Sequence, residues 1–104
     1  MISRVWHGWT TPENADAYET VVTTEVVPGI AARRIPGYRG AHVLRRALDD
    51  EVEFTTIIWF ESLDNVKAFM GEDYRKAHLP VNARAVLKRF DSEAEHLHIL
   101  SYFS

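Results

Sequence analysis

The stretch "VEFTTIIWF", residues 52–60, decides the fold. Its β-branched and aromatic residues are typical of a strand, and the polar run Asp49-Asp50-Glu51 before it is typical of a tight turn. Because residues 41–48 also have the composition of a strand, the two are predicted to form a β-hairpin. Successive side chains of a strand point to opposite faces. One face therefore carries Phe54, Ile58 and Phe60, and the other carries Ile57 and Trp59.

The residues before the hairpin predict one strand and one helix. Residues 2–10 are rich in β-branched and aromatic side chains, which favour a strand. Thr11 followed by Pro12 is a helix start, because a hydroxyl can cap free amides and proline needs no partner in the first turn. Pro28 is expected to kink this helix or end its regular part, and Arg33 and Arg34 to lie in its last turn. The apolar helix face consists of Ala15, Tyr18, Val22, Val26 and Ile30.

The residues after the hairpin predict a second helical region and a last strand. Ser62 is expected to cap a helix, and the apolar members of that helix are Leu63, Val66, Phe69 and Met70. Gly71 interrupts this helix, and a further helical stretch is predicted from Tyr74 to Lys88, broken near Pro80. Residues 93–103 are predicted to form the last strand.

The predicted order is strand, helix, strand, strand, helix, strand within a single domain over residues 1–104. This is the ferredoxin-like α+β pattern, βαββαβ, in which both helices lie on one face of a four-stranded antiparallel sheet. Both faces of residues 52–60 are therefore apolar, and the helices cover only one of them. An apolar sheet face without helices needs another cover. We therefore expect a homodimer whose two sheets pack face to face.

Composition argues against several kinds of site. The net charge is −3 and no basic run is long, which argues against nucleic acid binding. The chain has no cysteine for a disulfide or a thiolate metal site. It has no apolar stretch long enough for a membrane span and no signal-peptide pattern, so we expect a soluble, cytoplasmic protein. His96 and His98 share a strand face, but no third ligand is evident nearby, so no metal site is expected.

Four stretches resemble the antibiotic biosynthesis monooxygenase (ABM) domain, and the resemblance covers nearly the whole chain. They are His7-Gly8-Trp9-Thr10, Thr11-Pro12-Glu13-Asn14-Ala15, Pro36-Gly37-Tyr38-Arg39-Gly40 and Trp59-Phe60-Glu61-Ser62. The resemblance implies a dimeric α/β barrel, in which each ferredoxin-like subunit has its own pocket between helices and sheet. Some members oxidise aromatic polyketides to quinones with molecular oxygen and no cofactor. Others bind and degrade haem, and many have no known reaction.

The resemblance therefore implies a cofactor-independent monooxygenase acting on a small aromatic, polyketide-like substrate. Such a pocket needs a base for the phenolic proton and donors that stabilise the resulting anion. His78 is the candidate proton carrier. Asn65 and Phe69 are four apart on a predicted helix, and Tyr74 and His78 repeat that spacing. The candidate donors are Asn65, Tyr74 and Arg89, and the candidate substrate contacts are Trp59, Phe69, His7 and Trp9.

Each main candidate also has a structural interpretation. Asn65 and Arg89 can be solvated residues on a helix surface. Phe69 can belong to the core, and Tyr74 can pack with its hydroxyl in water. His78 can be a helix-end residue that bonds to water or main-chain carbonyls.

Two other functions stay open. Haem-degrading members have a histidine ligand in a setting similar to Tyr74-Arg75-Lys76-Ala77-His78. They also carry a tryptophan and an asparagine where this chain has Ala68 and His7. The remaining alternative is a non-catalytic dimer that binds a small hydrophobic molecule, which an interior filled by side chains would favour.

Overall fold

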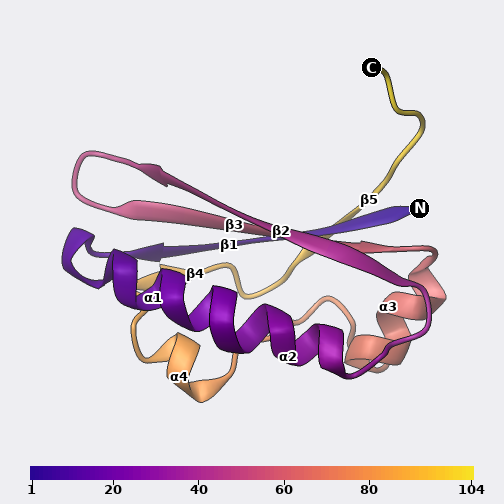
Figure 1. Cartoon of the computed structure of the whole chain (residues 1–104), viewed down its shortest axis with the longest axis horizontal. Coiled ribbons are helices and arrows are strands. Elements are labelled where there is room, and N and C mark those ends of the chain that lie inside the picture. Colours follow the sequence, from indigo (N-terminus) through magenta and orange to yellow (C-terminus); the bar gives the residue numbers. More distant parts are fainter.

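The hairpin forms over the predicted residues in the computed structural model, which describes all 104 residues (Figure 1). Strands β2 (Tyr38–Ala47) and β3 (Val52–Phe60) pair antiparallel, with a bulge between Tyr38 and Gly40. Strand β1 (Ile2–Thr10) pairs antiparallel with the other edge of β3 along its whole length. Strands β1 and β3 are therefore central, and the predicted antiparallel sheet is confirmed.

Two short strands, β4 (Arg89–Phe90) and β5 (Glu95–His98), share the free edge of β1. The sheet thus has five strands, and the prediction of one strand over residues 93–103 is wrong. Residues 92–94 leave the edge because their main chain finds partners elsewhere, whereas the Asp91 N–H still donates to the His7 carbonyl of β1. The Ala94 N–H donates to the Arg75 carbonyl at 2.7 Å, and Glu93 forms an isolated bridge with Lys76. The chain after His98 extends away from the sheet in Figure 1.

The predicted first helix is one continuous helical ribbon, residues 12–32, with changing helical type. It consists of a 3₁₀ turn (Pro12–Asn14), α1 (Ala15–Val21), a π-helical turn (Val22–Val26) and α2 (Val27–Ala32). The wide π turn directly precedes Pro28, which lacks an N–H and whose ring would clash with the carbonyl one regular turn earlier. The buried residues of the ribbon are Ala15, Tyr18, Val22 and Ile30.

Helix α3 (Leu63–Met70) follows the hairpin as predicted and buries Val66 and Phe69. Ser62 stands at its N-cap, but the hydroxyl donates to the side-chain oxygen of Asn65 at 2.8 Å and not to a main-chain amide. Gly71 ends the helix with a φ of +86°, a conformation that glycine adopts without strain.

The predicted helical stretch from Tyr74 to Lys88 is wrong, because only α4 (Val81–Arg84) is α-helical there. Pro80 disfavours a helix through the residues before it. In addition, the carbonyls of Tyr74 and Lys76, which a helix would need, accept hydrogen bonds from the Arg4 side chain. Residues 74–80 therefore run as an irregular segment, called the linker segment below. No helix is both long and apolar enough to span a bilayer.

All helices lie on one face of the sheet, as Figure 1 shows, and alternate strand residues point toward them. On β3 these are Val52, Phe54, Thr56, Ile58 and Phe60, all of which are buried. The opposite face, called the open face below, has no covering element. Leu44 and Leu97 on this face are 49% and 50% exposed. The open face consists of Ser3, Val5, His7, Trp9, His42, Leu44, Arg46, Glu53, Thr55, Ile57, Trp59, Arg89, Glu95 and Leu97.

Candidate functional site

A small cavity lies between the helical ribbon and the sheet. Its volume is about 30 Å³, room for roughly two water molecules. The ribbon forms one wall and strands β1 and β3 form the floor, so the cavity follows from the packing of these two layers. Its lining residues are Arg4, Trp6, Tyr18, Val22, Val26, Ile30, Thr56, Ile58 and His78.

Arg4 is the charged group of this cavity, and only 3% of it is exposed. It lies on the helix-facing side of β1 because it alternates with Ser3 and Val5. Its Nη1 donates to the Tyr74 carbonyl at 2.5 Å, and its Nη2 donates to the Lys76 carbonyl at 2.6 Å. Burial lowers the pKa of Arg4 to about 10, so the guanidinium stays charged at neutral pH.

His78 enters the cavity from the linker segment, which Arg4 holds in place. Its partly buried ring lies 5.1 Å from the ring of Phe69, centroid to centroid. Burial lowers the pKa of His78, and the charges of Arg33 and Arg4 lower it further. The imidazole is therefore neutral at pH 7 and able to accept a proton.

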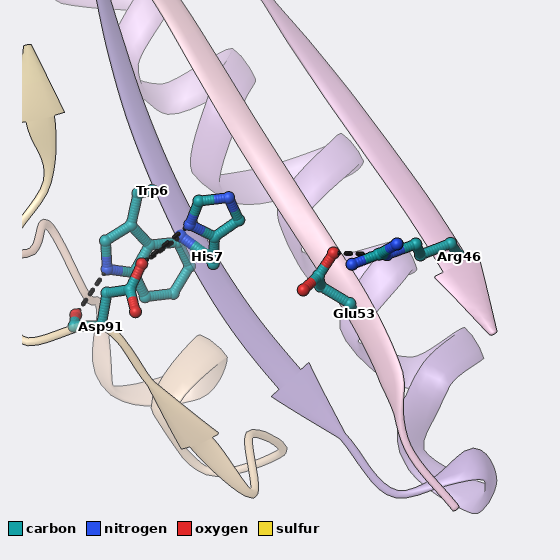
Figure 2. A network of polar contacts seen from close by, with 5 residues as sticks. All are labelled: Trp6, His7, Arg46, Glu53 and Asp91. Carbon is teal, nitrogen blue, oxygen red and sulfur yellow. Dashed lines mark hydrogen bonds and ion pairs between the residues drawn. The ribbon is translucent and has the colours of Figure 1, made fainter. Parts of the chain in front are cut away.

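Two side chains on opposite walls complete the polar and aromatic lining. Tyr18 is 2% exposed, and burial raises the pKa of its hydroxyl to about 12. Trp6 contributes an apolar surface, since its indole N–H donates to the Asp91 carbonyl at 2.7 Å (Figure 2). The cavity thus contains a cation, a neutral base and a phenol among apolar walls.

Phe69 lies in the core next to this cavity. It is 5% exposed and stacks on Phe60 with ring centroids 5.8 Å apart. The guanidiniums of Arg4 and Arg33 lie 5.7 and 5.0 Å from its ring centroid. Phe69 therefore backs His78 from the core side.

Asn65 and Tyr74 do not line the cavity. Asn65 accepts the hydrogen bond from Ser62 and fills the space against Gly37. The Tyr74 ring packs edge-on against His96 at 5.2 Å, in a separate groove at the outer edge of the sheet. Because the linker segment is not helical, the four-residue spacing does not bring Tyr74 and His78 to one face.

Arg89, Trp9 and His7 lie together at a different place. The Arg89 guanidinium stacks 3.9 Å from the Trp9 ring centroid, and it donates two hydrogen bonds to Glu51. The bond from Arg89 and a further one from Lys88 lower the pKa of Glu51 to about 2.

His7 is held on the open face by Asp91, and its ring packs on Trp9 with centroids 6.0 Å apart. Its Nδ1 lies 2.8 Å from a carboxylate oxygen of Asp91, as Figure 2 shows. The Arg46–Glu53 ion pair in the same view lies on the same face, with 2.7 Å between the bonded atoms. These contacts account for the polar groups at this end of the open face.

Trp59 also lies on the open face, away from the cavity. Its indole N–H donates to Nδ1 of His42 at 3.0 Å. Of the eight predicted site residues, the structure therefore brings His78 to the cavity and Phe69 next to it. The other six have contacts elsewhere.

Sequence reasoning missed Arg4 and Thr56 and took Tyr18 only as a helix-face residue. A signal for Arg4 existed, since it stands between Ile2 and Trp6 on one face of the predicted strand. A charge at such a position must be buried with its own partners. A charged residue between apolar residues on one face of a strand is therefore a candidate site residue.

Haem does not fit the residues present. The cavity beside His78 has a volume of about 30 Å³, far too small for a porphyrin ring. Phe69 and its stacked neighbour Phe60 fill the adjoining space.

Comparison with known proteins identifies the family. No curated protein sequence matches this chain. The family model described as antibiotic biosynthesis monooxygenase matches residues 1–80, from β1 through the linker segment that carries His78. This match covers most of the chain and agrees with the antiparallel sheet whose helices lie on one face. The chain therefore belongs to the antibiotic biosynthesis monooxygenase family.

Proposed function

We propose that this protein is a cofactor-independent monooxygenase that oxidises an aromatic, polyketide-like phenol with molecular oxygen. Family membership supports an oxygenase-like function in general terms. One observation carries the more specific proposal, namely that neutral His78 and cationic Arg4 line the same buried cavity. A base and a fixed positive charge are the two groups that an oxygen-dependent phenol oxidation requires.

In the proposed reaction, His78 removes a proton from the phenol or from its activated ring CH₂ group. The guanidinium of Arg4 stabilises the anion that forms. The anion passes one electron to O₂, and the two radicals combine to a peroxide anion. Protonated His78 returns its proton to this anion and gives a hydroperoxide. Loss of water then converts the CH₂ group to a carbonyl, so one oxygen atom enters the quinone and the other leaves as water. Phe69 supports His78 from the core side.

We assign the donor role to Arg4 and to the hydroxyl of Tyr18, a residue of the cavity lining. Burial raises the pKa of this hydroxyl, so it keeps its proton and can donate a hydrogen bond. Asn65, Tyr74 and Arg89 were the donors predicted from the sequence, and none of them lines this cavity. A tricyclic phenol needs more than the present 30 Å³. We propose that the irregular linker segment moves outward on binding, which requires its hydrogen bonds to Arg4 to break or shift, and that it can do so because it has no helical hydrogen bonds of its own.

The proposed working form is a homodimer that joins two open faces. Members of the family are often dimeric, and the open face leaves Val5, Ile57 and Trp59 partly exposed and Leu44 and Leu97 exposed in the single chain. Sedimentation at micromolar concentration is expected to show a dimer. Ile57→Glu places a charge at the centre of this face and is expected to give a folded monomer. A stable wild-type monomer would exclude this assembly.

The oxidation is tested by incubating the protein with an anthrone-type phenol, with and without oxygen. Oxygen consumption and quinone absorbance are expected only in the aerobic sample. His78→Gln is expected to lower kcat at least tenfold, since a general base contributes about 10²–10⁴-fold. His98→Gln, which changes an exposed histidine outside the cavity, serves as the matched control. Absence of any oxygen-dependent product would refute the proposed reaction.

The small cavity favours a second candidate, a non-catalytic dimer that binds a small molecule. This function predicts saturable ligand binding without oxygen consumption. The same incubation, followed by recovery of unchanged ligand, distinguishes the two candidates.

A further inference from the structure

We propose that the cavity selects a small aromatic anion, a carboxylate or phenolate on a flat ring, and that Arg4 is the group that recognises it. This inference rests on the proposed function for its site, but not on any oxidation. It names the charge of the ligand, which the family assignment leaves open.

The first observation is that Arg4 has no counterion. Its protein acceptors are the carbonyls of Tyr74 and Lys76 and the Nε2 atom of His96, at 2.5, 2.6 and 3.0 Å. All three are neutral, because burial and the nearby charges of Arg4 and Arg75 lower the pKa of His96 to about 4. A buried cation whose partners are all neutral is costly, and an incoming anion offsets that cost.

The second observation is that Arg4 has free donors. A guanidinium carries five N–H groups. Two on Nη1 and one on Nη2 meet the three protein acceptors, which leaves the Nε–H and one Nη2 hydrogen without a protein partner. Carboxylates accept parallel hydrogen bonds from such a planar donor set.

The third observation is the sign of the surrounding charge. No Asp or Glu lines the cavity. A second positive charge acts on this site, since the Arg33 guanidinium lies over the Phe69 ring and its charge lowers the pKa of His78 together with that of Arg4. The cavity therefore favours an anion, disfavours a neutral molecule of the same shape, and rejects a cation.

The fourth observation concerns the shape of the ligand. Trp6 and Tyr18 line the cavity with aromatic rings, and the remaining walls are aliphatic apart from Thr56. A flat apolar ring that bears one anionic group matches the chemistry of these walls and leaves the charge for Arg4. Such a ring needs more than the present volume of about 30 Å³, so its binding relies on the outward movement of the linker segment proposed above.

The test uses three probes that share a phenyl ring and differ in charge: benzoate, benzamide and benzylammonium. Titration calorimetry on the full chain is expected to give at least tenfold tighter binding for benzoate than for benzamide, and none for benzylammonium. A second pair, 4-nitrophenolate and 4-nitroaniline at pH 8, tests whether a phenolate replaces the carboxylate. Equal binding of benzoate and benzamide, or no binding of either anion, would overturn the inference.

Variants test the role of Arg4 directly. Arg4→Met removes the charge and is expected to abolish the preference for benzoate over benzamide. Arg4→Lys keeps the charge without the planar donors and is expected to retain a weaker preference. Arg39→Met is the matched control, since Arg39 is exposed and pairs with Glu61 outside the cavity. A full benzoate preference in Arg4→Met would refute the assignment.

A measurement on the wild-type chain keeps the test independent of how the variants fold. Benzoate is expected to raise the pKa of His78 in an NMR titration, because it compensates the charge of Arg4. Benzamide is expected to leave the His78 pKa unchanged. An unchanged His78 pKa at saturating benzoate would contradict the inference. Benzoate binding without oxygen consumption by a phenol would refute only the oxidation.

Discussion

Replacing Arg4 by methionine tests how the linker segment is held. Its two hydrogen bonds to main-chain carbonyls measure 2.5 and 2.6 Å. Charged hydrogen bonds contribute about 1.5–3 kcal/mol each, so their loss costs about 3–6 kcal/mol. Methionine fills much of the same space and avoids the burial of a cation. The pKa of about 10 for Arg4 indicates a burial cost of about 3 kcal/mol. The free energy of unfolding is therefore expected to fall by the difference of these two terms, about 0–3 kcal/mol.

The local effect distinguishes this mechanism from general destabilisation. The amides of Ala77 and Ala94 bond to the carbonyls of Ser92 and Arg75, which ties the linker segment to residues 92–94. Hydrogen exchange at these two amides is expected to accelerate about tenfold for each 1.4 kcal/mol lost. Urea unfolding gives the global value, and NMR exchange gives the local one.

Arg33→Met is the matched control for this prediction. Arg33 is exposed and donates one hydrogen bond, to the Phe69 carbonyl at 3.1 Å. Its replacement is expected to cost less than about 1 kcal/mol. The reasoning fails if Arg4→Met is as stable as wild type and the Ala77 and Ala94 amides exchange at unchanged rates.

Three further predictions follow from local geometry. Gly37→Ala is expected to lose about 1–3 kcal/mol in urea unfolding, because φ is +78° and the new Cβ would lie 2.2 Å from Oδ1 of Asn65. Thr10→Val is expected to raise the unfolding free energy by about 1 kcal/mol, because the fully buried hydroxyl has no hydrogen-bond partner. The folded-state pKa of His96, about 4, lies below that of an unfolded histidine, so the unfolded chain binds more protons between pH 6.5 and 4. Stability is therefore expected to fall by about 1–2 kcal/mol on acidification through this window, after a discount for partial exposure.

Each of these predictions has its own control. Adding Asn65→Ala to Gly37→Ala removes the clash and is expected to recover part of the loss, while the backbone strain stays. If the Thr10→Val variant is less stable than wild type, the Thr10 hydroxyl has a hydrogen-bond partner and the prediction is wrong. His96→Gln keeps an acceptor for Arg4 without titrating, and an unchanged pH dependence in this variant would contradict the assignment to His96.

The elements predicted well from the sequence are those that depend on neighbouring residues in the chain, such as an alternating strand or a helix start. Strand β3 forms over residues 52–60 because β-branched and aromatic side chains alternate between two faces. The first helix begins after Thr11 because Pro12 suits a first turn. That both faces of β3 are apolar was also predictable, since Ile57 and Trp59 alternate with Phe54 and Ile58, but which face the helices cover was not.

The predicted helix over residues 74–88 failed for a reason that no local pattern contains. Its carbonyls at Tyr74 and Lys76 bond to Arg4, which lies 70 and 72 residues earlier in the chain. The same contact carries His78 to the cavity through an irregular segment and not through helical spacing. The catalytic role of His78 stays a prediction.

The sequence by itself determined the order of the elements, the two-sided apolar sheet and the family, because side-chain alternation and turn residues act over a few neighbouring positions. Only the tertiary structure decided which side chains meet in the cavity. A periodic pattern states that Arg4 and Tyr18 face inward, but not which element lies opposite each of them. That choice depends on how the helical ribbon, β1 and the linker segment pack together.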